Sequence, residues 1–116
     1  MRRVCVLQVL PRRLRDVLLG WIPCPTKWEA ERIGKTLVSE NLAACANVLP
    51  RMSSFFIWEG KLRTVQECLL LLKVLKKNRV ASEKRILQLH SYDVPLIAFF
   101  EADSVNDAYL AWAEKP

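Results

Sequence analysis

His90 is the only histidine of this 116-residue chain and the first candidate for metal chemistry. A neutral imidazole is a good ligand for Cu(II) or Zn(II), but one imidazole binds weakly, because a tight site needs three or four donors. An oligomer would supply more donors if it brought three copies of His90 near its axis, and Cys24 is the nearest sulfur candidate. The alternative is a structural histidine at a helix C-terminus, bonded to backbone carbonyls.

A second candidate site begins in the segment Trp58-Glu59-Gly60-Lys61, which is typical of a hairpin turn. Gly60 can take the positive φ that such a turn requires. In one interpretation the indole of Trp58 only packs at the rim of the hairpin. In the other, Trp58 and Glu59 lie in a cleft between subunits, where an aromatic wall and a carboxylate hold a cation.

Lys73 and Tyr92 are the other polar candidates for this site. Lys73 interrupts an apolar stretch, which predicts either a subunit boundary or an ion pair with an acid. The candidate acids are Glu59, Glu67 and Asp93. Tyr92 follows His90 in a predicted loop and offers an oxygen donor. The predicted ligand-binding residues are Trp58, Glu59, Lys73 and Tyr92, and their grouping around one pocket is what the resemblance described below implies.

No arrangement typical of an enzyme is present in the sequence. There is no G-x-S-x-G motif, and three glycines are too few for a phosphate-binding loop. The four cysteines form no C-x-x-C pair, which argues against a zinc ribbon or a dithiol redox site. The aliphatic run 69–72 lacks the aromatic residues that an RNA-recognition sheet would need. We therefore expect a protein that is not an enzyme.

Composition and charge indicate one globular domain with a basic extension. The chain is 52% hydrophobic, and no uncharged stretch approaches the roughly 20 residues of a membrane-spanning helix. Much of the +6 net charge precedes the first acid, in residues 1–15, so we expect no nucleic-acid partner on the folded face. We assign residues 1–13 to this extension and 14–116 to the domain. A cytoplasmic location is expected, with a mitochondrial address as the alternative interpretation of the arginine-rich extension.

Three helices are predicted from caps and periodicity. Thr26 is a plausible N-cap, with Glu29 three residues later as a capping box, and an apolar stripe follows. Asn78 is a good capping residue for a second helix. Asp103-Ser104 is expected to cap a short last helix near the C-terminus.

Apolar runs predict four strands, and their order with the helices indicates the fold. The runs are 17–22, 42–49, which stops at Pro50 and is followed by a strand-like stretch at 53–58, then 65–75 and 94–100. The order is that of an α+β, ferredoxin-like βαββαβ domain with a short C-terminal helix. Two helices can cover only one face of a four-stranded sheet, yet the central strands are apolar on both faces. Another copy of the chain is the simplest cover for the second face.

Five short motifs follow one another along the chain. They are Cys24-Pro25, Leu42-Ala43-Ala44-Cys45, Trp58-Glu59-Gly60-Lys61, His90-x-Tyr92-x-Val94-Pro95 and Tyr109-Leu110-x-Trp112. Their order and spacing, over about residues 14–114, resemble the CutA family of divalent-cation tolerance proteins. The resemblance implies a ferredoxin-like trimer whose long second and third strands extend into neighbouring subunits. It also implies a link to copper tolerance in bacteria and to acetylcholinesterase in animals, with no established enzymatic reaction.

The chain departs from the family pattern at positions that bear on metals. The resemblance implies a copper site built from a cysteine late in the first strand and a His-His pair. Ile22 and Leu89 stand at two of those positions, so only His90 remains. Thr26-Lys27 replaces a usual acidic pair, and Leu96 replaces the glutamate after Val-Pro. The sequence therefore resembles a divergent member of the CutA family.

Three functional hypotheses follow from these observations. The first is a non-enzymatic homotrimer that binds copper(II) or another divalent metal through His90 and Cys24 and serves metal tolerance and response. The second is a trimeric assembly module of the acetylcholinesterase-anchoring type, which acts through protein partners and whose metal site has degraded. The third is a small-molecule sensor, because the resemblance places four residues around an inter-subunit pocket: Trp58, Lys73, His90 and Tyr92.

Overall fold

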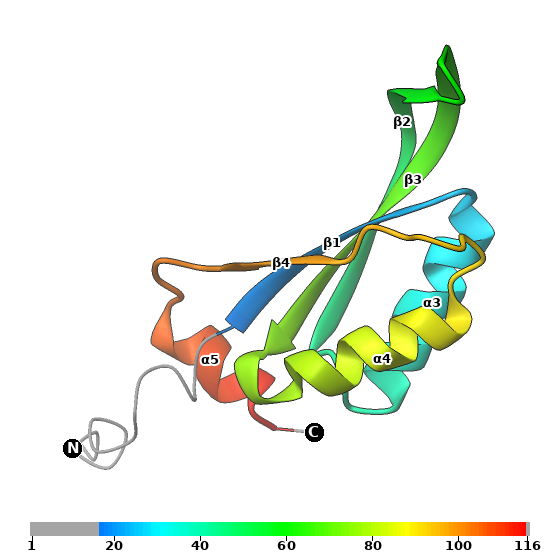
Figure 1. Ribbon diagram of the computed structural model, residues 1–116. Coiled ribbons are helices and arrows are strands. Elements are labelled where there is room, and N and C mark those ends of the chain that lie inside the picture. Colours follow the sequence, from blue (N-terminus) through cyan, green and yellow to red (C-terminus); the bar gives the residue numbers. More distant parts are fainter. Residues whose placement is uncertain (1–16, 116) are drawn as a thin grey trace, which may run out of the picture.

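The computed structural model describes residues 17–115, so the predicted basic extension at residues 1–13 lies outside the described residues. A four-stranded antiparallel sheet in the order β2-β3-β1-β4 forms the centre (Figure 1). The strands are β1 (Val17–Cys24), β2 (Cys45–Trp58), β3 (Lys61–Leu75) and β4 (Ala98–Glu101). The helices are α3 (Lys27–Ser39), the 3₁₀ turn η1 (Lys76–Asn78), α4 (Arg79–Leu89) and α5 (Asp107–Ala113). The predicted α+β, ferredoxin-like order is confirmed.

Helices α3 and α4 cover one face of the sheet, and the core lies between these layers (Figure 1). Alternate residues of β1 and β3 point into it, because side chains alternate across a strand. The fully buried members include Ile22, Ile33, Leu70, Leu72 and Ile86. Helix α5 closes a second, smaller cluster at one end of the sheet. Between residues 17 and 115 no helix is long and apolar enough to cross a membrane.

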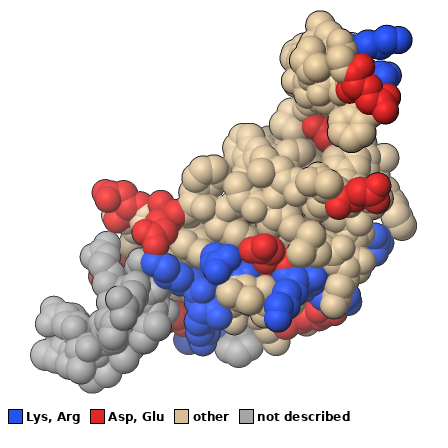
Figure 2. All heavy atoms as spheres, in the orientation of Figure 1, with Lys and Arg blue, Asp and Glu red and all other residues tan. Residues whose placement is uncertain are grey.

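The opposite face of the sheet, which we call the open face, carries large apolar side chains that no helix covers. Leu19, Trp21 and Phe100 are 42%, 40% and 55% exposed, and the strand register places them on one face. In Figure 2 the surface between the tip of the hairpin and α5 is mostly free of charged side chains. The prediction that the central strands are apolar on both faces, with two helices able to cover only one, is confirmed. The short helix α5 packs at one end of the open face, against Val17 and Leu75.

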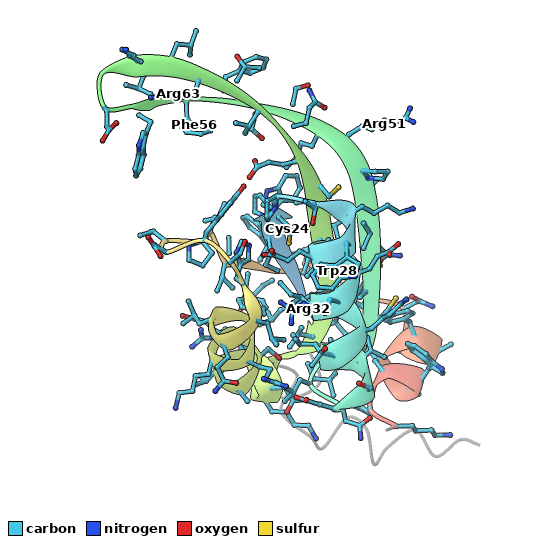
Figure 3. All side chains as sticks on the ribbon, turned by 90° about the vertical axis from the view of Figure 1, so that its right-hand side faces the viewer. Cys24, Trp28, Arg32, Arg51, Phe56 and Arg63 are labelled. Carbon is cyan, nitrogen blue, oxygen red and sulfur yellow. The ribbon has the colours of Figure 1, made fainter. Side chains whose placement is uncertain are left out.

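Strands β2 and β3 continue beyond the rest of the sheet as a two-stranded arm, residues 52–67. The molecule is therefore elongated, with extents of 60 × 26 × 22 Å. The strand does not end at Pro50, where the sequence predicted a break. A bulge between Leu49 and Met52, with Arg51 at φ 65°, bends the ladder and lets pairing resume. Figure 3 shows the arm arching away from α3, with Arg51 at its start and Phe56 and Arg63 near its tip.

The helix termini confirm one predicted cap and correct another. The Thr26 hydroxyl accepts a hydrogen bond from the Glu29 backbone N–H at 3.0 Å, which satisfies a free donor at the start of α3. The last helix begins at Asp107, after the extended residue Asn106, so the prediction that Asp103-Ser104 caps it is wrong. Leu110 of this helix packs with Val17 and Leu75 at the end of the sheet.

The last strand is also shorter than predicted. Its pairing with β1 begins at Ala98, whereas the apolar run begins at Val94. Pro95 has no N–H to donate to a ladder, and the segment 92–97 turns toward the arm instead of pairing with β1. This difference matters for the site, because the freed segment forms one of its walls.

Gly34 tests the close packing of α3 on the sheet. A Cβ atom at this position would lie 3.0 Å from Ala46 Cβ and 3.1 Å from Leu70 Cδ1. The clash would cost ~1–3 kcal/mol, more than the ~1 kcal/mol that alanine gains over glycine in a helix. We expect Gly34→Ala to lower the free energy of unfolding in urea by about 1 kcal/mol. Lys35→Ala, at an exposed position of the same helix, should change it little; equal stability of the two variants would contradict this packing.

Candidate functional site

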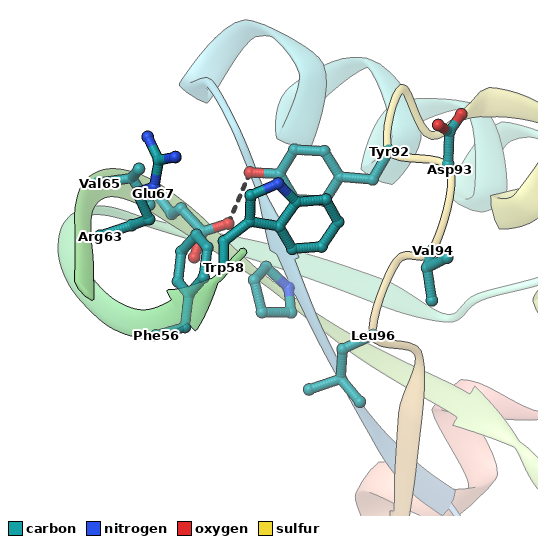
Figure 4. Close-up of a pocket in the computed structure, with 10 residues that line it drawn as sticks. Phe56, Trp58, Arg63, Val65, Glu67, Tyr92, Asp93, Val94 and Leu96 are labelled. Atoms are coloured by element: carbon teal, nitrogen blue, oxygen red, sulfur yellow. Dashed lines mark hydrogen bonds between the residues drawn. The ribbon is translucent and has the colours of Figure 1, made fainter. Parts of the chain in front are cut away.

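A cavity of about 910 Å³ lies between the arm and the segment 92–96 (Figure 4). The arm contributes Phe56, Trp58, Val65 and Glu67 to its wall, and the segment contributes Tyr92, Asp93, Val94 and Leu96. Side chains alternate between the two faces of the arm. Phe56 and Trp58 therefore lie on the same face as three residues of the paired strand, Arg63, Val65 and Glu67. Apolar and aromatic groups therefore dominate a hollow that holds few polar atoms, as is usual for small-ligand sites.

Glu67 is the most buried polar group of this cavity, with 9% of its surface exposed. The Ser54 hydroxyl donates to its Oε1 atom at 2.6 Å, and the Tyr92 hydroxyl donates to its Oε2 atom at 2.7 Å. Among residues 17–115 no lysine, arginine or histidine lies within ion-pair distance of this carboxylate. The sequence named Glu67 only as a possible partner of Lys73, although an acid inside an apolar strand was a signal for a buried site.

The hydrogen bond to Glu67 fixes the protonation of Tyr92. Burial raises the pKa of the Tyr92 hydroxyl, and the adjacent Glu67 carboxylate raises it further. The phenol therefore stays a hydrogen-bond donor throughout the physiological pH range. It ties the segment 92–96 to the arm across the cavity, as the dashed line in Figure 4 marks.

The structure separates the four predicted ligand-binding residues. Trp58 and Tyr92 both line the cavity. Glu59 lies in the hairpin turn at φ 52° and is not among the cavity-lining residues. Lys73 lies on the open face and donates to the Asn47 amide oxygen. No ion pair of Lys73 with its three candidate acids occurs within the described residues.

His90 holds the start of the segment that carries Tyr92. Its backbone N–H bonds Ile86 O at 2.8 Å and ends α4, and its Nε2 atom lies 2.9 Å from Pro23 O. Because a carbonyl oxygen can only accept, the hydrogen-bond partners assign the proton to Nε2. The Nδ1 atom then accepts from the Tyr92 backbone N–H at 3.1 Å. These contacts support the structural alternative for His90.

Glu29 completes this network from the other helix. It is 6% exposed, and its Oε2 atom accepts from the Ser91 backbone N–H at 2.9 Å. The same atom lies 3.4 Å from His90 Nδ1. In the predicted capping box, the Glu29 side chain would bond back to the Thr26 backbone N–H. Here the Glu29 carboxylate instead accepts a hydrogen bond from the segment that follows α4. The network links the start of α3, the end of β1 and the site.

The residues predicted as metal ligands do not fit a copper site within one chain. Both His90 ring nitrogens already have protein partners. The Cys24 thiol is fully buried and donates to Ile22 O at 3.6 Å. Burial, with a smaller contribution from the Glu29 carboxylate, raises the pKa of this thiol to about 12, whereas a metal binds the thiolate. No cluster of three potential ligand residues occurs within residues 17–115.

The buried thiol gives a direct test. Because burial raises the pKa of the folded Cys24 thiol from 9.0 to about 12, the folded state loses stability as pH rises from 9 toward 12. At pH 8 we expect iodoacetamide to modify the half-buried Cys45 and to leave Cys24 unmodified, as peptide mass spectrometry would show. Denaturant should make both reactive. Equal labelling of Cys24 and Cys45 in the native protein would contradict the burial.

Known proteins share both the sequence and the fold. The family model described as CutA1 divalent ion tolerance protein matches residues 18–116. The divalent-cation tolerance protein CutA of Pyrococcus horikoshii is 43% identical over 86 residues, which cover 73% of this chain and 83% of that protein. The CutA homolog of Danio rerio is 33% identical over 91 residues, covering 78% of this chain and 61% of that longer protein.

The fold comparison agrees with the sequence comparison. The crystal structure of CutA from Xylella fastidiosa superimposes with a TM-score of 0.81 at 37% identity, covering 84% of this chain and 93% of that one. The long β2–β3 pairing, the one-sided helix layer and the sequence match thus lead to one conclusion. The chain belongs to the CutA1 family of divalent ion tolerance proteins.

Proposed function

We propose that this chain is a non-enzymatic homotrimer that serves a divalent-cation response through its assembly. The observation that carries the proposal is apolar surface left uncovered by the chain itself. On the outer face of the arm, opposite the cavity, Phe55, Ile57 and Leu62 are 66%, 66% and 69% exposed. Together with the open face of the sheet they form exposed apolar surface of the kind that marks a protein–protein interaction site.

Burial of these side chains would supply the driving force for association. Full burial of a large apolar side chain contributes ~1.5–3 kcal/mol, and each copy presents several of them. The arm alone is a two-stranded ribbon, which is at best marginally stable in water. An arm that packs on a neighbouring copy gains both burial and rigidity. A closed ring of three copies satisfies every arm in turn, whereas an open chain leaves one arm exposed.

The relation to metals comes from relatives whose names describe divalent-cation tolerance. In this chain the occupied His90 nitrogens and the buried Cys24 thiol do not favour tight copper(II) binding. We therefore place the role in the assembled trimer and its protein partners rather than in a copper cofactor. This choice corresponds to the assembly-module hypothesis within the divalent-cation tolerance family.

Assembly can be tested by one substitution on the outer face of the arm. We expect wild-type protein to sediment as three 13.4 kDa chains and Ile57→Asp to sediment as one. Ile57 is exposed in the isolated chain, so the aspartate should leave the fold of each copy intact, as circular dichroism would show.

Leu87→Asp is the matched control, because Leu87 is 52% exposed on α4, on the helical side of the molecule. It should remain trimeric. A stable wild-type monomer at micromolar concentration would overturn the proposed assembly. Dissociation of both variants would show instead that any added charge disrupts the oligomer.

The copper hypothesis has its own measurement. We titrate wild-type protein and His90→Ala with Cu(II) in a calorimeter at neutral pH. We expect no micromolar Cu(II) site that depends on His90, because both of its ring nitrogens are engaged within the chain. The titrations of the two proteins should therefore look alike. Micromolar binding that is lost in His90→Ala would restore direct ligation and remove the assembly-only interpretation.

A further inference from the structure

We propose that the cavity between the arm and the segment 92–96 binds a small organic monocation, with an ammonium group at Glu67 and an apolar body against the aromatic walls. The inference deepens the proposed function, and it rests on that function because a neighbouring copy would hold the arm in place. Within one chain, however, every group named below already lies in the cavity wall.

Glu67 is a buried acid with no cationic partner among residues 17–115. A buried carboxylate is normally paired with a cation, because taking a charge out of water costs several kcal/mol. Glu67 receives two neutral hydroxyl donors and no cation from residues 17–115. A carboxylate has about four acceptor positions, so two remain for a ligand. An ammonium group supplies both the missing charge and further donors.

Aromatic side chains share the cavity wall with this carboxylate. Phe56 and Trp58 approach from the arm and Tyr92 from the loop, so three aromatic rings line the cavity (Figure 4). Aromatic faces attract cations, and the attraction grows when water is excluded. Val65 and Leu96 add aliphatic surface. An ammonium group attached to an aryl or alkyl body matches these walls better than a hydrated metal ion does.

The charged side chains of the cavity wall limit how many positive groups a ligand can carry. Besides Glu67, the described lining holds one more acid, Asp93, and one cation, Arg63, so its formal net charge is −1. Arg63 lies four residues before Glu67 on the same strand face, about 13 Å along the strand. It would repel a second positive group at that end. These positions favour one positive charge over two.

The probes are three small molecules that share a phenyl ring. They are 2-phenylethylamine, which is a cation at pH 7, the neutral 2-phenylethanol and the anion phenylacetate. We expect calorimetry to rank the cation first, the alcohol next and the anion last. Glu67→Gln should weaken cation binding by about tenfold or more, since a charge-assisted hydrogen bond is lost, and should leave alcohol binding nearly unchanged.

Glu31→Gln makes the same chemical change on the solvent side of α3 and should leave all three affinities unchanged. Leu96→Glu keeps Glu67 in place and adds a carboxylate to the cavity wall, where Leu96 is 54% exposed. It should tighten cation binding, and it keeps the proposal testable if Glu67→Gln does not fold. Absence of cation binding, equal binding of the three probes, or no response to either cavity variant would each overturn the proposal.

Sedimentation of the same samples separates this proposal from the proposed assembly. Trimeric protein that binds no cation refutes only the ligand. Monomeric protein whose cation binding depends on Glu67 refutes the trimer and keeps the ligand site. Loss of both cation binding and the trimer in Glu67→Gln, with Leu96→Glu unchanged from wild type, would assign Glu67 to assembly and refute the ligand.

Discussion

Two helices cannot cover both faces of a four-stranded sheet, and the rest of this structure depends on that constraint. Helices α3 and α4 bury one face, and the other keeps Leu19, Trp21 and Phe100 in contact with solvent. The arm adds a second apolar surface beyond the reach of either helix. The chain on its own therefore leaves apolar side chains of both surfaces in contact with solvent. Strands β2 and β3 extend beyond the helices that cover the sheet. This extension explains the elongated shape, the exposed hairpin and the open cavity.

The cavity owes its shape to a small polar network at the joint between the layers. His90 and Glu29 bond the backbone at the end of β1 and after α4, and so hold the segment that carries Tyr92. Tyr92 then reaches across to Glu67 on the arm. Polar groups in such a low-dielectric region must be satisfied, because an unpaired one costs more than the bond returns. Within residues 17–115 two neutral hydroxyl donors, from Ser54 and Tyr92, satisfy Glu67, and it makes no ion pair.

This use of His90 bears on the relation between the chain and its family. A histidine whose two nitrogens are both bonded within the fold has a structural role, and a buried thiol with a raised pKa resists forming a thiolate. Ile22 and Leu89 stand where the resemblance implies further copper ligands. The family fold is thus retained, while the residues that remain at those positions pack and brace the fold.

The sequence by itself determined the order of elements, the Thr26 cap, the two-sided apolar strands and the family, because these follow from periodicity and local motifs. It also named Trp58 and Tyr92, which the cavity contains. Only the tertiary structure could place Glu67 at the centre, since its partners Ser54 and Tyr92 lie 13 and 25 residues away in the chain. Likewise the bulge after Leu49 and the late start of β4 depend on strand pairing across the sheet. Local patterns specify which residues face inward, but long-range pairing decides which of them meet.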